Sequence, residues 1–211
     1  MSAATIQGTP DLNRVQRLRK RVLAALAAML IGSLPVTASV FGPETAMHET
    51  IESVGFGLIL MCVLGRTWSA LYIGGRKRET VVTDGPYSLV RNPLYLFSVM
   101  GAGGIGMTTG SVLFGIAFAL VAFLVFEGVV RSEETWLKSA FGADFAAYAA
   151  RVRRWRPRLS GWHDAYELPV HPRLVLTTFR DASLFLLAVP LSEGIDHLQE
   201  AGHLPVLLQL P

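Results

Sequence analysis

Residues 93–126 read PLYLFSVMGAGGIGMTTGSVLFGIAFALVAFLVF, thirty-four consecutive residues without a charged side chain. At a rise of 1.5 Å per residue, about 20 apolar residues cross the hydrocarbon core of a bilayer as a helix. The run is therefore too long for one upright span and too short for two complete ones. Five glycines and two threonines interrupt it between residues 101 and 110. This pattern predicts a helical hairpin over 93–130, with glycines that permit close contact between helices.

The composition of the whole chain excludes an ordinary soluble domain. Of its 211 residues, 51% are hydrophobic and 17% charged, and the mean hydropathy is +0.42. This length accommodates a single membrane domain over 1–211. One cysteine, Cys62, lies in an apolar segment, so a disulfide framework and a thiolate metal site are excluded. We also expect no metal site from the histidines, which show no ligand spacing and are assigned to surfaces or interfaces (His48, His163, His171, His197 and His203).

Two further hydrophobic segments precede the hairpin. Residues 22–41 are uncharged and follow five basic residues, which predicts a retained first span rather than a cleaved signal. Residues 51–73 form an expected second span that carries Glu52 and Arg66. A charge at such depth usually faces the bundle or extends to the interface. Arg66 can therefore bind a structural partner inside the bundle, or it can take part in the functional site.

Two segments follow the hairpin. Residues 131–158 continue it as an expected cytoplasmic amphipathic helix, which Gly142 can interrupt. Residues 174–211 are apolar at first and mildly acidic later, so they form a last span or an interfacial helix. The predicted fold is an all-α, polytopic integral membrane bundle. It has about five transmembrane or hairpin helices plus the cytoplasmic helix.

The distribution of positive charge predicts the orientation. Five of the 19 Lys and Arg residues precede the first span, four lie within 76–91 and nine within 131–180. Cytoplasmic segments are enriched in Lys and Arg, so the N-terminus, the loop at 75–92 and the region 131–173 are placed in the cytoplasm. The basic charge then serves topology and contact with membrane lipids, and no nucleic-acid partner is expected.

Polar residues gather at the cytoplasmic mouth of the hairpin. In DGPYSLVRNPLY, residues 84–95, a Gly-Pro-Tyr turn precedes Arg91 and Asn92. Pro93 suits the first turn of the following helix, and Asn92 suits its N-cap. Arg91 can simply extend to lipid headgroups, or it can belong to a binding site.

A second polar group lies where the returning helix leaves the membrane. Glu127, Arg131 and Glu134 are spaced i, i+4 and i+7, which places them on one helix face. Two carboxylates with a guanidinium between them can form a structural salt-bridge set. They can equally bind the ammonium and carboxylate of an amino acid. A sulfonium methyl donor would also need aromatic faces, for which the candidates are Tyr87, Tyr95, Trp136 and Tyr148.

Together, residues 84–95 and the sequence RSEETWLKSAFGADFAAYAARVRRWRP at 131–157 resemble the isoprenylcysteine carboxyl methyltransferase and phospholipid methyltransferase family. The resemblance covers roughly 60–158, with its elements in order. It rests on GPY at 85–87, RxPxY at 91–95, EExxL at 133–137 and FGxxFxxY at 141–148. Asn92 stands where the isoprenylcysteine enzymes have histidine, which weakens the prenylcysteine assignment more than the methyltransferase one.

The resemblance implies a membrane enzyme that uses S-adenosylmethionine at a pocket open to the cytoplasm of a bacterial inner membrane. Its acceptor would be a lipophilic small molecule or a lipid that enters from the bilayer. A carboxylate acceptor of the isoprenylcysteine kind needs no general base, whereas an amine acceptor would need one, with Glu134 or Glu127 as candidates. The implied catalytic residues are Arg91, Arg131 and Glu134. The implied cofactor residues are Tyr87, Asn92, Pro93, Tyr95, Glu133 and Glu134.

Three alternatives remain at the level of sequence. One is a phospholipid N-methyltransferase of the phosphatidylethanolamine type. Another is a non-catalytic membrane scaffold of the same fold. The third is a nicotinamide-dependent lipid reductase, which the EExxL element fits less well. No oligomeric state is predicted.

Overall fold

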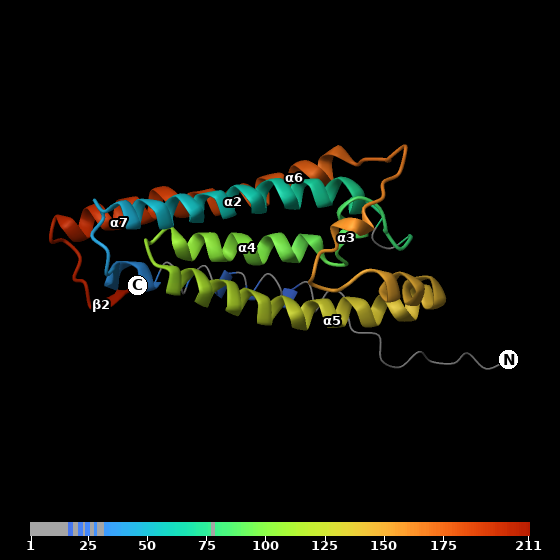
Figure 1. Ribbon diagram of the computed structural model, residues 1–211, viewed down its shortest axis with the longest axis horizontal. Helices are drawn as coiled ribbons and strands as arrows, with labels where there is room; N and C mark the ends of the chain where they lie inside the picture. The colour runs from blue at the N-terminus through green and yellow to red at the C-terminus, as the bar shows by residue number, and fades with distance from the viewer. Residues whose placement is uncertain (1–16, 19–20, 23, 26–27, 29–31, 77–78) are drawn as a thin grey trace.

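The computed structural model describes residues 17–18, 21–22, 24–25, 28, 32–76 and 79–211. Long helices run side by side along the longest axis (Figure 1). They are α2 (Ala46–Ile73), α4 (Pro93–Met107), α5 (Val112–Arg151), and α6 (Pro172–Ser183), which η3 (Leu184–Leu187) connects to α7 (Ala188–Glu200). The shorter elements are η1 (Leu34–Val36), β1 (Thr37–Ser39), α3 (Pro86–Leu89), η2 (Leu159–Gly161) and β2 (Leu208–Leu210).

The predicted all-α membrane fold is confirmed. Within the described ranges, three helical stretches are long and apolar enough to cross a membrane: Ala46–Ile73, Val112–Arg151 and Pro172–Glu200. The expected hairpin over 93–130 corresponds to α4 and the first half of α5, which pack against each other. The stretch Pro172–Glu200 has the length of a span, and α6 packs along α2.

Two predicted boundaries need correction. Six of the twenty residues of the expected first span, 22–41, lie outside the described residues. The described positions from Val22 to Ser33 are helical, but residues 34–41 are not α-helical. Thr37–Ser39 instead pairs in parallel with Leu208–Leu210 at the end of the chain. The expected helix over 131–158 ends at Arg151. Residues 152–158 leave the helix because their backbone bonds to the segment that precedes α4. The interruption expected at Gly142 is confirmed by its positive φ of 47°.

Local sequence explains where the helices begin. Thr45 caps α2, since its hydroxyl oxygen accepts a hydrogen bond from the His48 N–H at 3.3 Å. Ser111 caps α5 in the same way, accepting from the Phe114 N–H at 3.2 Å. Helix α4 begins with Pro93, whose missing N–H would have no partner in the first turn.

Large apolar side chains on the outside of the bundle indicate contact with lipid. Leu64 is 67% exposed on α2, Leu124 is 61% exposed on α5, and Leu176 is 66% exposed on α6. Such continuous apolar exposure is unfavourable in water and is expected on a protein surrounded by a bilayer. Inside the bundle, Arg66 is 7% exposed, and its Nη1 donates to the Ser98 hydroxyl at 2.8 Å. This bond shows the structural pairing that the sequence left open.

Glycines set the distance between the helices. A Cβ at Gly104 would lie 2.6 Å from the Gly55 carbonyl oxygen of α2. A Cβ at Gly106 would lie 2.6 Å from the Gly115 nitrogen of α5. Both contacts involve backbone atoms, so a side chain could be accommodated only if whole helices moved. The expected use of glycine for close helix contact is confirmed.

We expect Gly104→Ala to lower the free energy of unfolding by about 1–3 kcal/mol, the usual cost of overpacking a tight contact. The matched control is Gly57→Ala, since no atom lies within 4 Å of a Cβ at that position. The measurement is reversible unfolding of both variants in mixed micelles. Equal stability of the two variants would contradict the assigned α2–α4 contact.

Candidate functional site

The segment that follows α5 folds back onto the segment that precedes α4. The Arg91 N–H donates to the Arg153 carbonyl oxygen at 2.9 Å, and the Arg158 N–H donates to the Leu89 carbonyl oxygen at 3.0 Å. The Gly85 N–H likewise donates to the His163 carbonyl oxygen at 3.0 Å. Residues separated by more than 60 positions in sequence are therefore fixed side by side at one end of the bundle, where Figure 1 shows α3 next to the end of α5.

The turn at Gly85 sets the direction of α3. Its φ is +57°, and its position directly against the Tyr72 ring leaves no space for a Cβ. The Tyr72 hydroxyl donates to Asp164 at 2.9 Å. A side chain at Gly85 would thus be opposed by both backbone conformation and space. This turn places Tyr87 in a buried cluster with Tyr72 and Val82.

Glu134 is the centre of the polar site, and its side chain is only 8% exposed. The Arg154 Nη2 donates to its Oε2 at 2.7 Å, and the Arg154 Nε lies 3.2 Å from each carboxylate oxygen. The Arg91 Nε lies 3.4 Å from Oε1, as does the amide nitrogen of Asn92. Two guanidinium groups and an amide thus surround one buried carboxylate, which charge-assisted hydrogen bonds stabilise.

The guanidinium between the two carboxylates belongs to Arg154, which corrects the expected arrangement. Arg154 Nη1 contacts Glu127 Oε1 at 3.1 Å as well as binding Glu134. The hydrogen bonds to Glu134 raise the pKa of Arg154 above its usual value, despite the opposing effect of burial. Arg131 bonds to Glu127 at 2.8 Å, but its side chain is 70% exposed. In the described chain, no hydrogen bond or ion pair joins Arg131 to Glu134.

Tyrosine side chains connect the carboxylates to the turn. The Tyr95 hydroxyl donates to Glu133 at 2.8 Å, and its ring packs on Phe126 with centroids 5.1 Å apart. The Tyr148 hydroxyl donates to the Tyr87 backbone oxygen at 2.8 Å. All of these groups are buried. The aromatic rings and the carboxylates therefore form one compact site at the end of the bundle.

Two buried polar atoms of this site make no hydrogen bond: the Tyr87 hydroxyl, and the Arg91 Nε, which is held only by its ion pair with Glu134 at 3.4 Å. Burial raises the pKa of Tyr87 well above its ordinary value, and the nearby Tyr148, Glu133 and Tyr95 raise it further. The hydroxyl is therefore a neutral group that can donate. An unsatisfied buried polar group costs about 1–3 kcal/mol, so such atoms need an explanation. A polar ligand that supplies the missing partners would provide one.

The structure brings together most of the residues singled out from sequence. Tyr87, Arg91 and Tyr95 lie with the two glutamates Glu133 and Glu134, and the buried Pro93 begins the helix that holds them. Asn92 occupies the N-cap position of α4, but its side chain makes no cap hydrogen bond. This corrects the expected capping role, because the amide faces Glu134 instead.

One residue expected in the site lies apart from it, and two residues that were not expected belong to it. Trp136 packs edge-on against Phe141 and is not joined to the tyrosines. Sequence reasoning missed Arg154 and Trp155, whose indole N–H donates to Glu127. Both lie in a basic stretch that was assigned to membrane topology. Both residues closely follow the FGxxFxxY segment, and this position in the sequence could have indicated that they belong to the site.

Several known proteins are similar to this chain in sequence. Residues 53–144 match the family model described as phospholipid methyltransferase. The cobalt-zinc-cadmium resistance protein CzcN of Cupriavidus metallidurans is 38% identical over 79% of this chain and 76% of its own length. The nickel-cobalt-cadmium resistance protein NccN of Alcaligenes xylosoxydans is 33% identical over 80% of this chain and 78% of its own. No solved structure matches the chain significantly.

A third relative carries the name of an enzyme. Protein-S-isoprenylcysteine O-methyltransferase B of Arabidopsis thaliana is 30% identical over 59% of this chain and 69% of its own length. The apolar helices, the family model and this relative define a membrane protein of the methyltransferase class. The chain belongs to the isoprenylcysteine carboxyl methyltransferase and phospholipid methyltransferase family.

Proposed function

We propose that this protein transfers a methyl group from S-adenosylmethionine to a lipophilic acceptor, namely the carboxylate of an isoprenylcysteine-like small molecule. The reaction takes place at the cytoplasmic face of a bacterial inner membrane. One observation supports the proposal most strongly: the buried Tyr87 hydroxyl lacks a hydrogen-bond partner beside two buried glutamates. The relatives named as isoprenylcysteine O-methyltransferases support the same chemistry.

The donor groups of the site suit the cofactor. S-adenosylmethionine, when bound, supplies an electrophilic methyl group on a positively charged sulfur. The Arg91 guanidinium can bind a carboxylate, and Glu133 and Glu134 can bind an ammonium group. The rings of Tyr87, Tyr95 and Tyr148 offer faces that favour a cation. Their close packing excludes water and fixes the side chains, which is the main contribution a protein makes to a direct displacement.

An apolar groove supports a lipophilic acceptor. A shallow groove of about 540 Å³ lies on the outside of α2 and α4, lined among others by Leu60, Leu64 and Phe97. It ends at Trp68, which packs on the cluster that contains Tyr72 and Tyr87. A hydrocarbon chain lying in this groove would place its polar end next to the site. An acceptor dissolved in the bilayer could reach it without crossing water.

The hydrogen bonding of the glutamates favours a carboxylate acceptor over an amine. An amine must lose a proton to become a nucleophile, so a general base is required. The two candidates, Glu127 and Glu134, are both bound to Arg154. Those bonds would have to break before either carboxylate could accept a proton. A carboxylate acceptor needs no such step.

Calorimetric titration of S-adenosylmethionine into the detergent-purified protein tests the proposal. We expect Arg91→Gln to weaken binding at least tenfold, since a hydrogen bond to a charged group contributes about 1.5–3 kcal/mol. The control is Arg156→Gln, which removes the same charge from an exposed position in the same basic stretch. If the folded wild type bound no cofactor with or without a prenylcysteine analogue, the non-catalytic scaffold would replace the enzyme.

The chemical nature of the product distinguishes the acceptors. Membranes that contain the protein are supplied with methyl-labelled cofactor and either a farnesylated cysteine analogue or phosphatidylethanolamine. A base-labile methyl ester on the analogue would support the carboxylate acceptor. A base-stable methylated headgroup would instead identify a phospholipid N-methyltransferase.

A second candidate function, a role in resistance to divalent transition metals, is favoured by the similarity to CzcN and NccN. Both relatives carry that role in their names, and each match covers more than three quarters of both chains. Growth of a deletion strain in graded cobalt, zinc, cadmium and nickel tests it. Complementation with wild type and with Arg91→Gln would show whether any resistance requires the methyltransferase site.

A further inference from the structure

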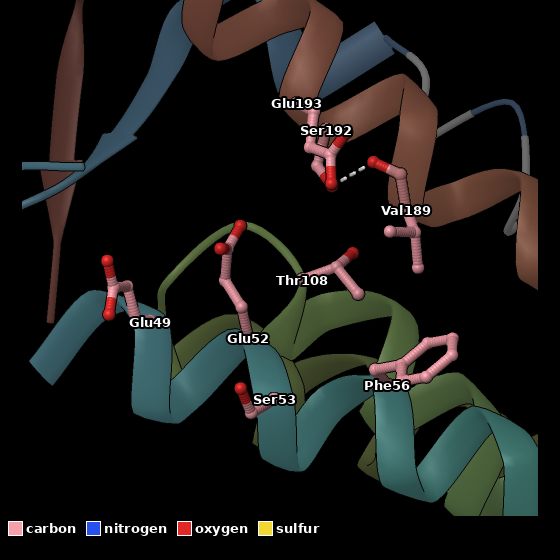
Figure 2. Close-up of a pocket in the computed structure, with 8 residues that line it drawn as sticks. All are labelled: Glu49, Glu52, Ser53, Phe56, Thr108, Val189, Ser192 and Glu193. Carbon is pink, nitrogen blue, oxygen red and sulfur yellow. Dashed lines mark hydrogen bonds between the residues drawn. The ribbon is translucent and has the colours of Figure 1, made fainter. Parts of the chain in front are cut away.

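A second polar pocket lies at the opposite end of the bundle from the methyltransferase site. It has a volume of about 370 Å³ and is formed between α2, the end of α4 and α7. Figure 2 shows Glu49 and Glu52 rising from α2 toward α7, with Ser192 and Glu193 facing them from above and Thr108 at the side. In Figure 1 this end holds the start of α2 and the whole of α7, whereas α3 lies at the other end.

A histidine and two carboxylates meet beside this pocket. One ligand atom from each of His48, Glu52 and Asp196 lies within 4.8 Å of the other two. The His48 Nε2 is 3.4 Å from Glu52 Oε1 and 3.9 Å from Asp196 Oδ2. His48 and Glu52 are one turn apart on α2, and Asp196 comes from α7. The tertiary packing of these two helices therefore completes the group.

The surroundings of His48 fix which ring nitrogen faces the carboxylates. The residue is 3% exposed, which corrects its assignment to a surface or interface. Its Nδ1 lies 3.3 Å from the Phe41 carbonyl oxygen, an arrangement that places a proton on Nδ1. The ring also packs directly against Gly110, where a Cβ would collide with it. The imidazole is thus held with Nε2 directed at Glu52 and Asp196.

This orientation brings three hydrogen-bond acceptors together unless a proton or a metal ion lies between them. When the Nδ1 of a neutral imidazole carries the proton, Nε2 can only accept a hydrogen bond. Ionised carboxylate oxygens also only accept, so three acceptors would face one another without a donor. A proton on the ring or on a carboxyl group removes this conflict, and a bound metal ion removes it as well. The nearby Glu49 and Glu193 increase the negative potential that attracts a divalent cation.

We propose that His48, Glu52 and Asp196 bind a divalent transition-metal ion of the Zn²⁺ and Co²⁺ class. One imidazole and two carboxylates are a ligand set that these ions accept at about 2.0–2.2 Å. Three protein ligands leave at least one position for water or for a ligand from the adjoining pocket. The predicted orientation of the chain places this site on the face of the membrane opposite to the cytoplasm. This proposal departs from the expectation from sequence that the histidines form no metal site.

Cobalt absorption on the full-length, detergent-purified protein tests the site. Wild type is expected to bind one Co²⁺ with visible d–d bands that Zn²⁺ removes by displacement. Asp196→Asn and Glu52→Gln keep the size of each side chain but remove a ligand charge, and each should weaken Co²⁺ binding at least tenfold. Circular dichroism of each variant confirms that the helices remain folded.

The matched control is Glu193→Gln, which removes a charge from the same pocket without removing a proposed ligand. We expect it to bind Co²⁺ within about threefold of wild type, because screening limits the effect of a charge that does not coordinate. Absence of Co²⁺ and Zn²⁺ binding by wild type would overturn the proposal. Equal weakening in Glu193→Gln would do so too, since it would show attraction by net charge alone. Titration with S-adenosylmethionine tests the site at the other end of the bundle. The metal-site proposal and the methyltransferase proposal can therefore fail independently of each other.

Discussion

Arg154→Met is expected to destabilise the protein by about 3 kcal/mol, the lower end of the range for breaking a buried ion pair. The lower end applies because the Arg154 side chain is 32% exposed, while that of Glu134 is only 8% exposed. Methionine preserves much of the side-chain volume but leaves Glu134 without its three hydrogen bonds from this guanidinium. Chemical or thermal unfolding in detergent measures the loss.

The same substitution should reduce methyl transfer about a hundredfold, the cost of displacing an aligned group by roughly 1 Å. Arg154 holds Glu134 and Glu127 together, and without it the two carboxylates repel each other. Arg156→Met is the control, because Arg156 is exposed in the same basic stretch. Wild-type stability and activity in Arg154→Met would show that Arg154 does not organise the site.

Tyr87→Phe is expected to raise stability and weaken cofactor binding at the same time. The Tyr87 hydroxyl is buried without a hydrogen-bond partner, so its removal relieves a cost of about 1–3 kcal/mol. If the hydroxyl bonds to a charged group of S-adenosylmethionine, its loss should weaken binding by about 10- to 100-fold. A gain in one property with a loss in the other is the signature of a group retained for function. Unfolding and calorimetry on the same preparation measure both.

Tyr148→Phe is the matched control for this experiment. It removes the same hydroxyl from a buried tyrosine nearby, but that hydroxyl donates to the Tyr87 backbone oxygen at 2.8 Å. Its loss should therefore lower stability by about 1–3 kcal/mol, since a buried carbonyl is left without its donor. If Tyr87→Phe also lowered stability, its hydroxyl would have a partner and the assigned ligand position would be wrong.

Periodicity and composition predicted the parts of the fold that depend on local sequence. The thirty-four uncharged residues from Pro93 predicted the hairpin. The glycines within it predicted close helix contact, such as the contact that Gly104 makes with Gly55. The resemblance to a family implied one site made of Tyr87, Arg91, Asn92, Pro93, Tyr95, Arg131, Glu133 and Glu134. The structure leaves Arg131 at its edge, exposed and bonded to Glu127. The assembly of this site with Arg154 could not be predicted, because it depends on backbone bonds between distant segments such as Arg91 and Arg153.

Sequence alone therefore determined the membrane class and the family, because hydrophobic run length and short motifs are properties of neighbouring residues. Only tertiary structure decided which guanidinium binds Glu134, since Arg131 is closer along the chain but points outward. It also decided that His48 and Asp196, 148 positions apart, face each other. The reason is the same in both cases: the partners of a buried charge are set by helix packing, which brings together residues that no local spacing connects.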